Sequence, residues 1–157
     1  MPPRKPDPDG PAYVAAVAAA FDRGEDPPQA ALRSAARYLL HVLEAAAPGR
    51  SVEMRVVPVG AVQCVAGPRH TRGTPPNVIE TDPVTWFRLA TGRLRWADAV
   101  ETGAVRASGA RADLSQYLPL TWFLLATGRL GWAEAVRTGA IKASGARADL
   151  SAYLPLS

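Results

Sequence analysis

The sequence has few of the residues that build covalent or metal-bound sites. Cys64 is the only cysteine among the 157 residues, and His41 and His70 are the only histidines. A single cysteine excludes an intrachain disulfide and gives no sign of an oxidising compartment. Cys64 and His70 stand six positions apart with no second ligand pair, unlike the known zinc spacings. We therefore expect no metal, no cofactor and a cytoplasmic location.

Long apolar runs and a strong charge asymmetry are also missing. No stretch has the length of a membrane span, and the proline-punctuated start MPPRKPDPDG is unlike a signal peptide. The 18 cations exceed the 14 anions only slightly and are scattered along the chain. Proteins that bind nucleic acids usually gather their cations on one face or tail. We predict neither nucleic-acid binding nor stable membrane insertion.

Motifs that position a catalytic group are absent as well. The sequence contains no nucleophile elbow, no phosphate-cradling loop and no dinucleotide fingerprint. Cys64 lies in an extended apolar run, which favours a small core residue. The alternative is a reactive thiolate activated by Arg69 or His70. We predict that the protein is not an enzyme, and an enzyme using Cys64 or a bound thiol cofactor stays as a third hypothesis.

Two helices are predicted in the first third of the chain. Residues 1–10 contain four prolines and are expected to form a disordered tail. Apolar residues then recur at helical spacing over 11–24 and again over 27–49. Asp26 directly precedes the longer helix and is predicted to cap it.

Short strands follow the helices. Residues 51–57 alternate between apolar and charged side chains, which is typical of a half-buried strand. Residues 61–65 could pair back as a hairpin, and 77–81 form a third strand candidate. The third candidate runs directly into Asp82 and Pro83, a pair that favours the start of a helix.

From Thr85 the chain repeats itself, and residues 121–156 match residues 85–120 at 29 of 36 positions. Each copy is expected to form two short helices, a strand and a final helical turn. The acidic cap precedes only the first copy, so we predict that this copy completes the sheet. The second copy is then an appendage that sets residues 140–144 beside a strand edge. Its exchange between molecules could form a homodimer, and a duplication without function is the alternative.

The run LATGRLRWADAVETGAVRASGARADLSQYL resembles the closing segment of the sterol carrier protein family. Residues 51–120 are similar to the small bacterial branch of that family. The positions that carry the resemblance are Leu89, Ala90, Gly92, Leu94, Ala99, Gly103, Val105, Gly109, Leu114 and Leu118.

This resemblance implies an α+β fold with a twisted sheet of about five mostly antiparallel strands. Helices on one face would enclose an apolar cavity, which in the wider family takes sterols, fatty acids or acyl thioesters. The sterol-carrier-like domain would span residues 11–120, with residues 121–156 appended to it. The pattern leaves open whether the space between sheet and helices is hollow or filled by side chains.

The candidate ligand site has an apolar wall and a polar mouth. The wall would be formed by Val52, Met54, Val56, Val62, Trp86, Phe87, Leu89, Leu114, Tyr117 and Leu118. Arg69, His70 and Arg72 would bind the polar end of a ligand, because cations in a glycine-rich loop suit a phosphate or carboxylate. The alternatives are a solvated loop and tryptophans that act only as core anchors.

We predict non-catalytic binding of a hydrophobic or amphipathic small molecule, such as a lipid, fatty acid or acyl thioester. The alternative is an accessory or regulatory module of a partner enzyme, with a filled core and no ligand of its own.

Overall fold

The computed structural model describes residues 5–68, 73 and 75–156. In chain order its elements are α1 (Gly10–Asp22), α2 (Gln29–Ala46), β1 (Val52–Val56), β2 (Gly60–Cys64), β3 (Val78–Thr81), α3 (Pro83–Ala90), α4 (Trp96–Glu101), β4 (Val105–Ser108), the 3₁₀ helix η1 (Ser115–Tyr117), α5 (Thr121–Ala126), α6 (Trp132–Arg137) and the 3₁₀ helix η2 (Ser151–Tyr153). Residues 5–9 precede α1 without forming a helix or strand.

The four strands form one sheet in the order β2-β1-β3-β4. β1 and β2 make the predicted hairpin, with Met54 opposite Val62. β1 also pairs with β3 in parallel, and β3 pairs with β4 in antiparallel orientation, with Glu80 opposite Arg106. The sheet is mostly antiparallel, as predicted, but it has four strands where about five were expected. The first copy of the repeat supplies β4, in agreement with the prediction from its acidic cap.

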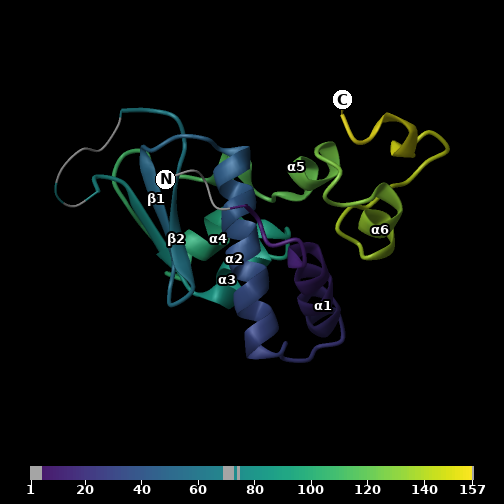
Figure 1. Ribbon diagram of the computed structural model, residues 1–157, viewed down its shortest axis with the longest axis horizontal. Coiled ribbons are helices and arrows are strands. Elements are labelled where there is room, and N and C mark those ends of the chain that lie inside the picture. The colour runs from purple at the N-terminus through teal and green to yellow at the C-terminus, as the bar shows by residue number, and fades with distance from the viewer. Residues whose placement is uncertain (1–4, 69–72, 74, 157) are drawn as a thin grey trace.

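Helices cover one face of this sheet (Figure 1). Along β1, Val52, Met54 and Val56 are buried in the hydrophobic core, and the side chains of Glu53 and Arg55 pair with each other. This alternation is what a strand with one covered face produces. α2 packs against α1, α3 and β2, so it forms the centre of the helical layer. The architecture is the α+β class predicted from the sequence.

The two predicted acidic caps differ in outcome. The Asp82 carboxylate accepts a hydrogen bond from the backbone N–H of Thr85 at 2.9 Å, which confirms the cap of α3. Asp26 does not cap α2, because that helix begins only at Gln29 and its N-cap residue is Pro28, which makes no side-chain cap bond. Consecutive prolines at 27 and 28 hold the chain extended after Asp26. The prediction for Asp26 is therefore wrong.

The second copy lies beyond α2 from the sheet in the view of Figure 1, where α5 and α6 are labelled. Residues 140–144 form no strand there, so their predicted pairing with a strand edge is wrong. Each copy closes on its own first helix. The N–H of Leu120 donates to the carbonyl of Ala90, and the N–H of Leu156 donates to the carbonyl of Ala126, both at 2.9 Å. Among the described residues, no helix is long and apolar enough to cross a bilayer.

Candidate ligand-binding site

The residues predicted as an apolar wall lie together in the hydrophobic core or against it. Seven of them are at most 1% exposed: Val52, Met54, Val56, Trp86, Phe87, Leu89 and Leu114. The remaining three are partly buried and pack against that core: Val62, Tyr117 and Leu118. The structure therefore brings the predicted wall together, and these side chains contribute to the packing between the sheet and its helices.

Trp86 anchors α3 to α2. Its indole Nε1–H donates to the backbone carbonyl of Ala36 at 3.1 Å, and the side chain is 0% exposed. The neighbouring Phe87 ring lies 5.6 Å from the ring of Phe21 in α1, in a tilted arrangement. A buried indole with a satisfied N–H is typical of a core anchor. The two aromatic residues that open the first repeat thus hold three helices together.

The predicted polar mouth, Arg69, His70 and Arg72, lies outside the described residues. Asn77, the residue immediately before β3, has a buried side chain. The Asn77 amide donates to the carbonyl of Ser51 at 2.9 Å and accepts from the N–H of Arg111 at 3.0 Å. The first bond joins the start of β3 to the start of β1, and the second joins it to the segment that follows β4.

Cys64 is a core residue, as one of the two interpretations predicted. It ends β2 and is 0% exposed. Burial raises the pKa of its thiol to about 12, and the negative charge of Glu44 adds to that rise. The thiol is therefore protonated at neutral pH, whereas a catalytic cysteine requires the thiolate. Within the described part of the chain, no group of three His, Cys, Asp or Glu side chains is arranged to hold a metal ion.

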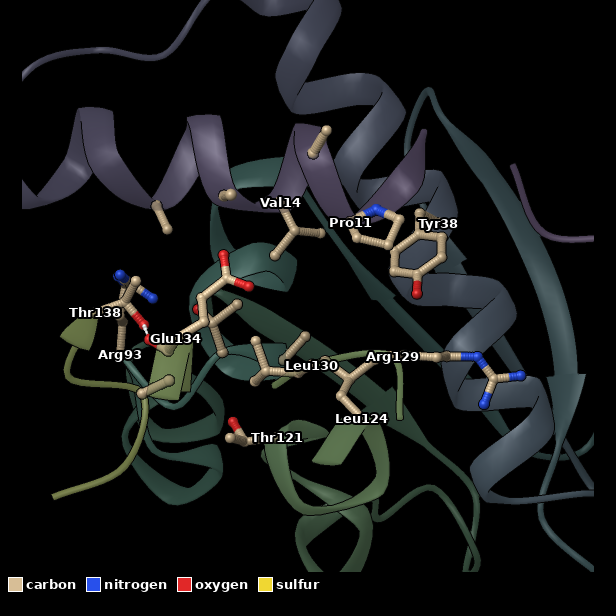
Figure 2. Close-up of a pocket in the computed structure, with 16 residues that line it drawn as sticks. Pro11, Val14, Tyr38, Arg93, Thr121, Leu124, Arg129, Leu130, Glu134 and Thr138 are labelled. Carbon is tan, nitrogen blue, oxygen red and sulfur yellow. Dashed lines mark hydrogen bonds between the residues drawn. The ribbon is translucent and has the colours of Figure 1, made fainter. Parts of the chain in front are cut away.

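A mainly apolar pocket lies between α1 and the second repeat (Figure 2). Its cavity volume is about 240 Å³. α1 contributes Pro11, Ala12, Val14, Ala15 and Ala18, and α2 contributes Tyr38. The first repeat contributes Ala90, Thr91 and Arg93. The second repeat contributes Thr121, Leu124, Arg129, Leu130, Glu134, Thr138 and Ala140. None of the residues predicted as the apolar wall lines this pocket.

Tyr38 and Arg129 mark one end of the pocket (Figure 2). Burial raises the pKa of Tyr38, and the positive charge of Arg129 opposes that rise. The phenol is therefore a neutral hydrogen-bond donor at physiological pH. The Arg129 guanidinium lies 5.5 Å from the centroid of the Phe123 ring. Among the described residues no carboxylate pairs with Arg129, so this end of the pocket is positively charged.

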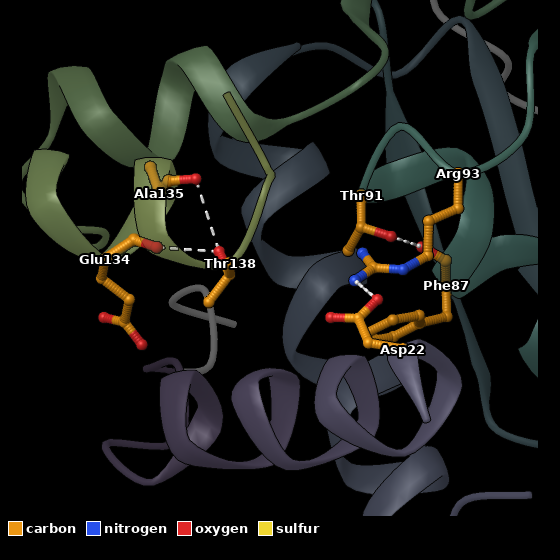
Figure 3. Close-up of polar contacts among 7 residues, drawn as sticks. All are labelled: Asp22, Phe87, Thr91, Arg93, Glu134, Ala135 and Thr138. Atoms are coloured by element: carbon orange, nitrogen blue, oxygen red, sulfur yellow. Dashed lines mark hydrogen bonds and ion pairs between the residues drawn. The ribbon is translucent and has the colours of Figure 1, made fainter. Parts of the chain in front are cut away.

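The opposite end of the pocket carries charges that are largely balanced (Figure 3). Arg93 pairs with Asp22 of α1 at 3.0 Å and is therefore neutralised. The carboxylate of Glu134 lies 3.9 Å from Arg137, a loose and exposed pair. The hydroxyl of Thr138 donates to the carbonyl of Glu134 at 2.8 Å, so it is already satisfied. An anion approaching this end would meet an arginine that is already paired and the weakly paired carboxylate of Glu134.

Sequence patterns did not reveal this pocket because it depends on how the second repeat packs against α1. One signal was present in the sequence. Arg88 of the first copy becomes Leu124 in the second. Arg88 is exposed and lies 5.0 Å from the Phe21 ring, whereas Leu124 is 7% exposed and lines the pocket. The replacement of a charged residue by leucine at this position of the repeat is therefore a sequence signal that Leu124 packs in an apolar environment.

Comparison with known protein families matches residues 28–120 to a family described as bacterial SCP orthologs, SCP standing for sterol carrier protein. The match covers more than half of the chain and ends at the last residue of the first repeat. α1 and the second repeat, which supply most of the pocket lining, lie outside the matched segment. A search of curated proteins gave no significant match.

Proposed function

Because the chain belongs to the family of bacterial SCP orthologs, we propose that it binds and carries a hydrophobic or amphipathic small molecule and catalyses no reaction itself. The observation that carries the proposal is the pocket between α1 and the second repeat. The proposed cargo is a lipid, a fatty acid or an acyl thioester, and the proposed location is the cytoplasm.

The size of the pocket limits the cargo. A cavity volume of about 240 Å³ is small beside the roughly 300 to 1,000 Å³ of pockets that enclose drug-sized ligands. A single alkyl chain or a small apolar ring system fits such a space, and a whole sterol does not. The favourable term is the removal of apolar ligand surface from water, at about 25 cal/mol per Å² before the costs of association.

The charges around the pocket orient the cargo. An apolar tail would contact Val14, Leu124 and Leu130, and its polar group would lie at the end formed by Tyr38 and Arg129. The Tyr38 phenol and the Arg129 guanidinium can both donate hydrogen bonds to a carboxylate or phosphate. The predicted wall and mouth around the sheet remain a second candidate site, for which Arg69, His70 and Arg72 would bind the polar group.

The test is a variant that places a charge in the pocket. Leu124→Arg restores the residue of the first copy and puts a guanidinium among apolar side chains. We expect it to weaken the binding of dodecanoate about ten-fold, measured by titration calorimetry. Ala152→Gln is the matched control, because it also restores a first-copy residue but lies at an exposed position away from the pocket. Its affinity should equal that of the wild type.

Native mass spectrometry of freshly purified protein provides a second readout, which should detect a co-purified amphiphile. Protein that carries no ligand and gives no heat with dodecanoate would contradict the carrier proposal.

The alternative, an accessory module without a ligand, is favoured by a different observation. The second repeat exposes large apolar side chains: Trp122 is 56% exposed, Tyr153 70% and Leu156 68%. Exposed apolar side chains of this size can contribute to a protein contact. Among macromolecular partners we propose a second copy of this chain, forming a homodimer by exchange of the repeated segment, because that segment is present twice.

A further inference from the structure

The first repeat occupies a defined surface of the molecule, which we call the repeat slot. The slot consists of α2 and β3, where they contact the first repeat. In it, the Trp86 indole donates to the Ala36 carbonyl at 3.1 Å, and β4 pairs with β3. The hydroxyl of Thr81 donates to the carbonyl of Ala104 at 2.7 Å and closes the edge of the slot.

The second repeat presents to solvent three apolar side chains whose counterparts in the first repeat are fully buried. Trp86, Leu114 and Leu120 are each 0% exposed. Their counterparts Trp122, Leu150 and Leu156 are 56%, 37% and 68% exposed. These three apolar side chains are therefore buried against a complementary surface in the first repeat and exposed in the second. The surface that fits the second repeat is present in every molecule of this protein.

Almost all of the amino-acid differences between the two copies lie at positions that do not pack into the slot. In the first copy, five of the seven differing positions are exposed: Arg88, Arg95, Glu101, Arg106 and Gln116. The sixth, Asp98, is half-exposed. Only the seventh, Val105, is buried, and Ile141 replaces it with one additional methylene group. A change of that size is tolerated in many cores.

Most of the local structure that the slot requires is already formed in the second repeat. α6 and η2 occupy the same positions of the repeat as α4 and η1. The missing element is the strand, which would form once residues 141–144 reached the edge of β3. Lys142 would then lie opposite Glu80, which pairs with Arg106 in the present arrangement.

We infer that the repeat slot is a binding site for either copy of the repeat, and that the second repeat can fill it in place of the first, in its own chain or in a second copy. This inference extends the proposed homodimer, and it rests on how the two repeats pack rather than on any ligand. The first copy is favoured because Asp82 caps α3 and no acidic residue precedes α5. A cap of this kind changes the balance about five-fold. The contact of Arg88 with Phe21 favours the first copy further.

The test places a charge at the same core position of each repeat. Leu114→Asp disables the first copy for the slot, Leu150→Asp disables the second, and the double variant disables both. We expect Leu150→Asp to unfold like the wild type in urea. Leu114→Asp should keep a cooperative unfolding transition, because the second repeat takes over the slot. The double variant should lose that transition, since a buried unpaired carboxylate is then unavoidable.

Hydrogen exchange identifies which copy forms the strand. In the wild type, amides 105–108 should exchange slowly and amides 141–144 fast. In Leu114→Asp this order should reverse, with exchange of 141–144 slowed at least about ten-fold. Sedimentation then measures the oligomeric state of Leu114→Asp. A monomer indicates that the second repeat fills the slot of its own chain, and a dimer indicates that it fills the slot of a second copy. If Leu114→Asp loses its cooperative transition as completely as the double variant, the inference is overturned, whatever the ligand titrations show.

Discussion

The two repeats place nearly one amino-acid sequence in two surroundings. Their helices are alike in both. The hydroxyl of Thr91 donates to the carbonyl of Phe87 at 2.7 Å, and that of Thr127 donates to the carbonyl of Phe123 at 2.8 Å. These bonds join residues four positions apart, as helical bonds do. The helices of this segment are therefore specified by the segment itself.

The strand differs between the repeats. Residues 105–108 form β4, and residues 141–144 form no strand although two of the four residues are identical and the other two are conservative replacements. A strand is completed by hydrogen bonds to a neighbour, and only the first copy has β3 beside it. The comparison shows that the helical parts of the repeat follow from its own residues and that its strand depends on its place in the fold.

The largest expected effect comes from the tryptophan that each repeat carries at its second position. Trp122→Ala should change the free energy of unfolding by no more than about 0.5 kcal/mol, because that side chain is mostly exposed. Trp86→Ala combined with Trp122→Ala should lower it by about 3 to 5 kcal/mol, the usual cost of deleting a buried indole. Urea denaturation measures both. Equal stability of the two variants would show that the indole of Trp86 is not needed in the core.

A smaller effect is expected from the Asp82 cap, which is present at the start of the first repeat and has no counterpart at the start of the second. Asp82→Ala should lower the free energy of unfolding by about 1 kcal/mol, because the N–H of Thr85 loses its acceptor. The same variant should raise the exchange rate of amides 105–108, since it removes an advantage of the first copy. Asp9→Ala is the control, because Asp9 precedes α1 without a side-chain cap bond. A cap that contributes nothing would leave both variants equally stable.

The smallest effect concerns a charge pair present in one repeat only. Hydrogen bonds from Arg95 hold the pKa of Asp98 below its usual value. A carboxyl whose folded-state pKa is lowered stabilises the protein above its unfolded pKa, and this contribution is lost as the pH falls through the folded pKa. Arg95→Gly copies the residue found at position 131 and should return the pKa of Asp98 toward its usual value.

NMR titration of the Asp98 carboxyl measures this change. The pKa of Asp149 provides an internal control, because the backbone N–H of Ser151 lowers it and Arg95 takes no part. An Asp98 pKa that stays low in Arg95→Gly would assign the shift to another cause.

The parts of the fold that could be predicted from the sequence are those with a local physical signal. Alternation along Val52, Met54 and Val56 identified β1, since a strand with one covered face has a period of two. Asp82 identified the start of α3, because its carboxylate reaches an N–H three residues away. Asp26 carried the same signal, but the two prolines after it delayed the helix. Local signals thus failed where a neighbouring residue restricted the backbone.

The pocket could not be predicted in the same way. It is formed by residues far apart in the chain, such as Val14 and Leu130, and neither has a spacing that points to the other. The buried wall residues were identified as apolar and inward-facing, which they are. The sequence pattern did not distinguish a side chain that fills a core from one that borders a cavity, because both are apolar and both recur at the period of their element.

The closure of each repeat on its own first helix has a genetic consequence. Because Leu120 returns to Ala90 and Leu156 returns to Ala126, the end of each unit lies beside the C-terminal end of its own first helix. Adding or removing one 36-residue unit is therefore expected to leave the sheet intact, because one copy remains to supply β4, whereas the pocket needs both copies.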